Sequence, residues 1–85
     1  MDRPGRRSPR FYYRQEYAEF CGRLTKARES AGLTQREAAD RLGRSQSFVA
    51  KSESGERRVD VIELAEFAKL YGRPVTFFLP GKRNP

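Results

Sequence analysis

The sequence predicts an all-α fold of five helices, preceded by a disordered basic arm. Apolar residues recur at three- and four-residue steps, glycines follow the periodic segments, and strand-like alternation is missing from the sequence. A chain of 85 residues has room for one small hydrophobic core. We therefore expect a single helical domain over residues 11–80.

The two ends of the chain have a different composition. Residues 1–10 combine four arginines with two prolines and a glycine and have almost no apolar content. Such a segment cannot bury enough apolar surface to offset the entropy of ordering, so we expect a disordered arm. Residues 81–85 are expected to form a flexible tail.

The first helix is expected to carry one apolar stripe and to end at Gly32. The stripe consists of Tyr13, Tyr17, Phe20, Leu24, Ala27 and Ala31. A later helix begins at Asp60 with Glu63 in the capping-box position. Its buried stripe consists of Leu64, Phe67, Ala68 and Tyr71. Pro74 is placed to open a short fifth helix over Val75–Leu79.

Between these helices, two short ones are expected over residues 35–42 and 46–53. Thr34 and Glu37 form a capping box for the first, and Gly43 is free to take the positive φ of the turn between them. Helices of two turns are unstable alone, so they must pack against each other and the rest of the domain.

The spacing of four residues indicates how the two helices cross. These residues are Gln35, Ala39, Gly43 and Val49. Ala39 is small enough for a close crossing, and Val49 fills the gap between the helices. The pattern is typical of a helix-turn-helix unit, in which the second helix enters the major groove of DNA.

Outward-facing residues of this unit predict contacts with DNA. A glutamine can pair with adenine and a lysine with guanine or a phosphate. We expect base contacts from Gln46, Ser47 and Lys51. We expect phosphate contacts from Gln35, Arg44, Ser45, Arg57 and Arg58. Phe48 either meets a thymine methyl group or packs in the domain, and packing is the interpretation we favour.

The net charge agrees with a polyanionic partner. Lysine and arginine outnumber the acidic residues by 18 − 11 = +7, and residues 1–14 alone contribute five arginines against Asp2, or +4. The chain has no histidine and one cysteine, Cys21, so it offers neither a metal cluster nor a Cys–His pair. We expect no enzymatic activity, no cofactor and no metal. The sequence also lacks an apolar segment long enough for a signal peptide or a membrane span, and a cytoplasmic, nucleoid-associated protein is expected.

Residues 20–79 resemble the Cro/lambda-repressor type of helix-turn-helix domain, the XRE family. The resemblance rests on the segment Leu24–Gln35, on SQSFVAKSESGERR, and on the end of the helix after Asp60. It implies the lambda-repressor-like five-helix fold and a phosphate contact from Gln35. It further implies base contacts from the recognition helix and an ion pair between Arg28 and Glu53.

Two departures from the family pattern stand out. Ser52 replaces a large apolar residue, leaving space that Phe48, Val61 or Phe67 can fill. The other departure is the arginine-rich arm, which either lies along a DNA groove or only raises non-specific affinity.

The resemblance implies a sequence-specific regulator of transcription that binds double-stranded DNA, acting as a repressor and as a homodimer. Phe77, Phe78 and Leu79 cannot all face one small core, so one or two of them are expected to enter it and the remainder to form a two-fold dimer patch. The alternative is that these residues only seal the end of the first helix beside Tyr13 and Tyr17. The alternative is an antitoxin or adaptor of the same fold whose main role is to bind a protein, such as a toxin or the transcription machinery.

Overall fold

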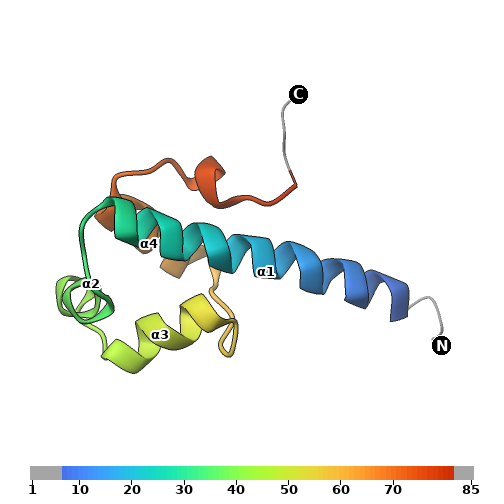
Figure 1. Ribbon diagram of the computed structural model, residues 1–85, viewed down its shortest axis with the longest axis horizontal. Coiled ribbons are helices and arrows are strands. Elements are labelled where there is room, and N and C mark those ends of the chain that lie inside the picture. Colours follow the sequence, from blue (N-terminus) through green and yellow to red (C-terminus); the bar gives the residue numbers. More distant parts are fainter. Residues whose placement is uncertain (1–6, 82–85) are drawn as a thin grey trace.

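The computed structural model describes residues 7–81, with side chains from Arg14 onward. This part of the chain is entirely helical apart from turns and loops (Figure 1). The elements are α1 (Arg7–Ser30), α2 (Gln35–Leu42), α3 (Gln46–Ser54), α4 (Val61–Tyr71) and the 3₁₀ helix η2 (Val75–Phe78). The predicted all-α fold is confirmed, with the fifth helix reduced to a single 3₁₀ turn.

The start of α1 differs from the prediction. Residues 7–10 were expected to belong to the disordered arm, but α1 begins at Arg7 and continues without a break to Ser30. The backbone of this helix therefore carries the last arginines of the predicted arm. Residues 1–6 and 82–85, which hold the rest of the arm and most of the predicted tail, lie outside the described residues.

The predicted capping signals are present. The Thr34 hydroxyl accepts a hydrogen bond from the Glu37 amide (3.0 Å), and the Glu37 carboxylate accepts one from the Thr34 amide (2.9 Å). Asp60 and Glu63 form the same reciprocal pair at the start of α4. Gly43 has a φ of 71°, which lets the chain leave α2 and enter α3 after two residues. These local contacts fix where the short helices begin and end.

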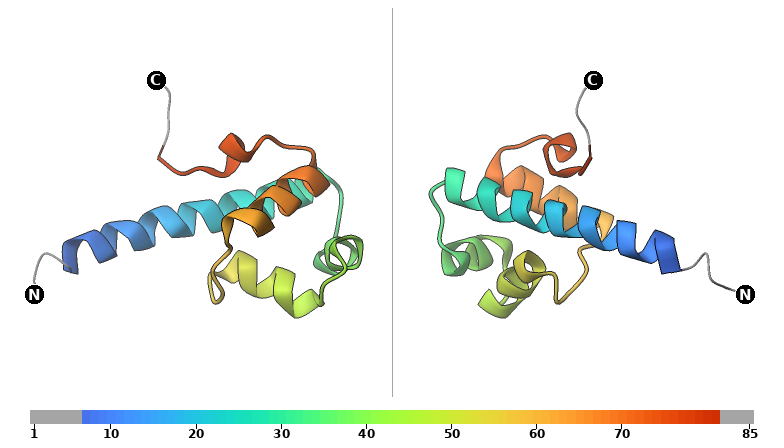
Figure 2. Two further views of the ribbon diagram at one scale, coloured as in Figure 1. Left: turned by 180° about the vertical axis from the view of Figure 1, so that it is seen from behind. Right: turned by 45° about the vertical axis from the view of Figure 1, so that its right-hand side comes forward.

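The core lies between α1 and α4, with α2 and α3 packed on one side and η2 on the other (Figures 1 and 2). Its buried residues come from every element. They are Phe20, Cys21, Leu24, Ala27, Ala38, Ala39, Val49, Leu64, Phe67, Ala68, Tyr71 and Phe78. Ala31, which the stripe placed inward, is exposed because α1 ends at Ser30. No helix in residues 7–81 has the length and apolar character required to cross a bilayer.

Ser52 occupies a fully buried position on α3. Its hydroxyl donates to the Phe48 carbonyl one turn earlier (2.7 Å), so the buried polar group is satisfied. Phe48 and Phe67 stack beside this region with ring centroids 5.8 Å apart. Val61, which was considered as a filler, is 72% exposed and takes no part in the core.

Candidate nucleic-acid interface

The helix α3 has one buried side and one exposed side. Ser45 caps its start, where the hydroxyl accepts a hydrogen bond from the Phe48 amide (3.1 Å), and Gly55 ends it with a φ of 88°. Val49 and Ser52 are completely buried against the rest of the domain. The opposite side is open to solvent.

The residues expected to contact bases all lie on that open side. Gln46, Ser47 and Lys51 are exposed, and the partly exposed Ala50 lies among them in the helical order. Because their positions span less than half of the helix circumference, an amide, a hydroxyl and an ammonium group share one surface. This surface can present donors and acceptors to base edges.

A buried ion pair fixes the end of α3 against α1. The Arg28 Nε donates to Glu53 Oε2 (2.7 Å) and its Nη2 to Glu53 Oε1 (3.2 Å), with the two side chains 12% and 6% exposed. The remaining Arg28 Nη1 donates to the Leu33 carbonyl (2.8 Å). Hydrogen bonding to Glu53 raises the pKa of the Arg28 guanidinium above its ordinary value. The ion pair that the family resemblance implied is thus present.

Gln35 joins the same network from the start of α2. Its Nε2 donates to Glu53 Oε1 (3.0 Å), and the side chain is half-buried. The Glu53 carboxylate therefore links the end of α3 to the end of α1 and to the beginning of α2. One N–H of the Gln35 amide nitrogen is engaged with Glu53. The predicted phosphate contact of Gln35 therefore falls to the second N–H of the same nitrogen.

Two of the arginines expected to contact phosphate lie together on the ring of Phe48. The Arg44 and Arg57 guanidinium carbons are 4.5 and 4.4 Å from the ring centroid. Arg57 also donates two hydrogen bonds to Glu63 (3.0 and 2.9 Å), and Arg44 pairs with Glu66 (3.3 Å). The pairing with Arg57 lowers the pKa of the Glu63 carboxyl. Phe48 thus packs within the domain and supports both cations.

Sequence reasoning missed this cluster. The sequence predicted Glu63 only as the capping residue of α4. Its carboxylate accepts hydrogen bonds both from the Asp60 amide and from the Arg57 guanidinium. Arg57 and Glu63 are six residues apart and lie on a loop and a helix, so helical spacing gives no signal for their contact.

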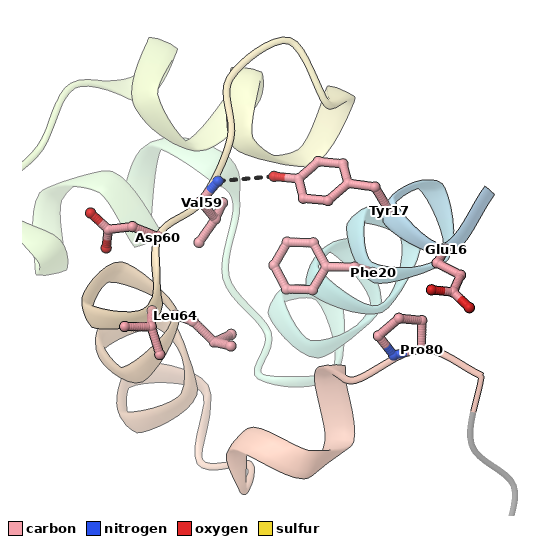
Figure 3. A pocket seen from close by; sticks show the side chains of 8 residues that line it. Glu16, Tyr17, Phe20, Val59, Asp60, Leu64 and Pro80 are labelled. Carbon is pink, nitrogen blue, oxygen red and sulfur yellow. Dashed lines mark hydrogen bonds between the residues drawn. The ribbon is translucent and has the colours of Figure 1, made fainter. Parts of the chain in front are cut away.

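The loop between α3 and α4 is held on α1 by Tyr17. The Tyr17 hydroxyl accepts a hydrogen bond from the Val59 amide (2.9 Å) and donates to the Arg57 carbonyl (3.4 Å), as Figure 3 shows for Val59. The Arg58 guanidinium lies 4.5 Å from the centre of the Tyr17 ring. Tyr17, predicted only as a stripe residue, thereby positions both arginines of the loop next to the recognition helix.

An apolar hollow of about 290 Å³ opens beside this loop (Figure 3). It is lined by Glu16, Tyr17, Phe20, Val59, Asp60, Val61, Leu64 and Pro80. Val61 and Ile62, at the start of α4, are 72% and 67% exposed. The domain therefore has an apolar surface in addition to its polar recognition surface.

The expected dimer patch at the end of the chain does not form as a unit. Phe78 is fully buried and Phe77 half-buried against it, with the two ring centroids 5.2 Å apart. Only Leu79, 43% exposed, offers substantial surface. Phe78 is thus one of the residues that enter the core and is removed from the candidate patch, because the chain turns at η2 and directs this ring into the core beside Phe20.

Comparison with known proteins agrees with this geometry. Residues 19–76 match the family described as a helix-turn-helix domain. A solved structure titled as an XRE-family like protein from Pseudomonas syringae pv. tomato str. DC3000 is 41% identical and aligns with a TM-score of 0.78. The alignment covers 84% of this chain and 87% of that chain. The chain belongs to the XRE family of helix-turn-helix proteins. A comparison with curated proteins finds no match.

The XRE-type fold is that of DNA-binding regulators and is typical of proteins without enzymatic activity. Within residues 7–81, no three histidine, cysteine or acidic side chains are grouped so as to hold a metal ion. Cys21 is buried at 6% exposure, which raises the pKa of its thiol, and its sulfur lies 3.6 Å from the Ser52 carbonyl oxygen. It therefore packs as a small core residue.

Proposed function

We propose that this XRE-family chain is a sequence-specific double-stranded DNA-binding regulator of transcription that reads the major groove with α3. One observation carries the proposal. Gln46, Ser47 and Lys51 share the exposed side of α3, and Val49 and Ser52 on its other side are completely buried in the domain. A helix held in this way presents fixed side chains to base edges.

In this proposal the remaining cations bind the backbone. Arg44 precedes α3 and Arg57 and Arg58 follow it in the chain, and the Arg44 and Arg57 guanidinium groups meet over Phe48. The exposed Ser45 hydroxyl and the start of α3 suit a phosphate oxygen. Glu63 and Glu66 hold two of the arginines in place in the free protein. Binding to DNA then requires the arginines to share their hydrogen bonds with phosphate, and affinity is expected to fall steeply with salt.

We further propose that two copies bind half-sites about one helical turn apart and repress transcription by occupying a promoter in the cytoplasmic nucleoid. A second candidate function is binding to a protein partner, as an antitoxin or adaptor does. The apolar hollow beside the exposed Val61 and Ile62 favours this alternative, because the reading of bases does not use that surface.

Selection of bound duplexes from a random pool tests the recognition surface. The Gln46→Ala and Lys51→Ala variants are each expected to lose about 1–3 kcal/mol of discrimination at particular base pairs. Arg58→Ala is expected to weaken binding to all sequences alike. Gln15→Ala and Lys26→Ala, exposed substitutions on α1, serve as matched controls. An unchanged preferred sequence after Gln46→Ala would contradict the assignment of α3.

A further inference from the structure

The hydroxyl of Tyr17 connects α1 to the backbone of the loop between α3 and α4. Its oxygen accepts a hydrogen bond from the Val59 amide (2.9 Å), which Figure 3 draws, and donates one to the Arg57 carbonyl (3.4 Å). A phenol can act both as a donor and as an acceptor, and the loop uses both roles. Because these two backbone groups precede and follow Arg58, one hydroxyl fixes the chain on both sides of that residue.

The ring of Tyr17 holds the side chain of Arg58 as well. The Arg58 guanidinium carbon lies 4.5 Å from the ring centre, within the range of a cation–π contact. The ring itself packs against the buried Phe20, with the two ring centroids 5.3 Å apart. The position of Arg58 is therefore set by the hydrophobic core through Tyr17.

The other arginine of the loop, Arg57, is held at both its backbone and its side chain. Its guanidinium donates to the two carboxylate oxygens of Glu63 (3.0 and 2.9 Å) and lies 4.4 Å from the centre of the Phe48 ring. Its carbonyl oxygen is the acceptor of the Tyr17 hydroxyl. Both arginines of the loop are thus ordered in the free protein.

We propose that Tyr17 is a positioning residue for DNA binding, which holds Arg57 and Arg58 where they meet phosphates of the duplex that α3 reads. The inference rests on the proposed function and adds to it a residue that acts through these two arginines. Immobilising a long side chain on binding costs affinity, and side chains already held in the free protein avoid much of that cost. Since phosphates carry no sequence information, the contribution of Tyr17 is the same for all sequences.

The test compares two substitutions that each remove one phenolic hydroxyl. Tyr17→Phe removes the group that binds the loop. Tyr71→Phe, on α4, removes a buried hydroxyl that has no hydrogen-bond partner among the described residues, and it is the matched control. Affinity of the full chain for the selected duplex is measured at moderate salt. We expect Tyr17→Phe to bind about three- to tenfold more weakly and Tyr71→Phe to bind like the wild type, with the same preferred sequence in all three proteins.

A second measurement separates positioning from a loss of folded protein. Individual phosphates of the duplex are replaced by neutral methylphosphonates, and the factor by which each replacement weakens binding is recorded. A smaller folded fraction lowers the affinity for every duplex alike and leaves these factors unchanged. With Tyr17→Phe, the factors should fall at the phosphates that the Arg57→Gln/Arg58→Gln variant no longer senses, and only there. In the Arg57→Gln/Arg58→Gln background, Tyr17→Phe should have no further effect on affinity.

The inference is wrong if Tyr17→Phe binds as tightly as the wild type, or if its affinity falls while the phosphate factors stay unchanged. It is equally wrong if Tyr17→Phe weakens binding by the same factor with and without the two arginines. A wild type that selects no duplex at all would instead contradict the proposed function.

Discussion

Glu53 connects three helices through a single buried carboxylate. It accepts hydrogen bonds from Arg28 on α1 and from Gln35 on α2 while belonging to α3. Glu53→Ala leaves the Arg28 guanidinium buried without its charge partner, and we expect the free energy of unfolding to fall by about 3 kcal/mol. Urea denaturation measures this loss. Glu56→Ala, an exposed change two residues beyond α3, should cost less than about 0.5 kcal/mol.

A comparable loss in both variants would show that the network contributes little to stability. The expected contrast is large because the Glu53 side chain is only 6% exposed. In that position water cannot replace the missing carboxylate.

Glu63 gives the domain a dependence on pH. Its pKa is lowered in the folded state, chiefly because Arg57 donates two hydrogen bonds to the carboxylate. A lowered pKa contributes stability above the pKa of the unfolded chain, and the contribution is lost as pH falls through the folded-state pKa. Glu63→Gln removes the charge and keeps an acceptor for the Asp60 amide.

We therefore expect the Glu63→Gln variant to melt at a lower temperature than the wild type at about pH 7. The difference should shrink as the pH falls below the ordinary pKa of a glutamate and through the lowered folded-state pKa of Glu63, where the wild-type carboxylate becomes protonated. Thermal unfolding followed by circular dichroism over this range measures the two melting temperatures. A constant difference across the range would mean that the ion pair is not its source.

At the scale of elements, replacing a glycine by alanine is expected to have opposite effects on stability inside a helix and directly after one. Gly43 follows α2 with a φ of 71°, a conformation that strains any side chain, so Gly43→Ala should destabilise the fold by about 1 kcal/mol. Gly22 lies inside α1, and an added methyl group meets nothing within 4 Å at either position. Gly22→Ala should therefore stabilise the fold by up to about 1 kcal/mol. Denaturation curves of both variants test the sign, and two changes of the same sign would contradict the argument.

The sequence predicted elements whose causes are local. The bounds of α2 and the start of α4 follow from caps and glycines within a few residues, and both agree with the structure. The exposure of Gln46, Ser47 and Lys51 follows from helical spacing once Val49 is placed inside. Such features need no knowledge of the rest of the chain.

Features that depend on distant parts of the chain were predicted poorly. The burial of Phe78 depends on how η2 folds back onto Phe20 of α1, and the position of Arg57 depends on Tyr17, forty residues away. The start of α1 was missed for a different reason. Pro9 and the arginines suggested disorder, yet a proline is tolerated in the first turn of a helix.

At the scale of the whole molecule, polar and apolar surfaces lie on different parts of the domain. The exposed side of α3 carries the residues proposed to read DNA, whereas Val61 and Ile62 lie at the start of α4 beside the apolar hollow. Exposed aliphatic residues next to a hollow are typical of a protein-binding surface. Two occupants fit this surface: the partner protein of the second candidate function, and a second copy of the chain bound to the neighbouring half-site.

The proposed dimer predicts a difference between duplexes with one and with two half-sites. Val61→Ser/Ile62→Ser should leave the affinity for a single half-site unchanged, because these residues lie away from α3, and should reduce the cooperative gain on the double site by about tenfold. Gel-shift titrations on both duplexes give the two affinities and the number of bound copies. Val75→Ser, at a residue 40% exposed on η2, is the control and should retain cooperativity. If cooperativity survives the Val61→Ser/Ile62→Ser change, this surface does not join the two copies. That result would favour the antitoxin alternative, in which the surface binds a partner protein.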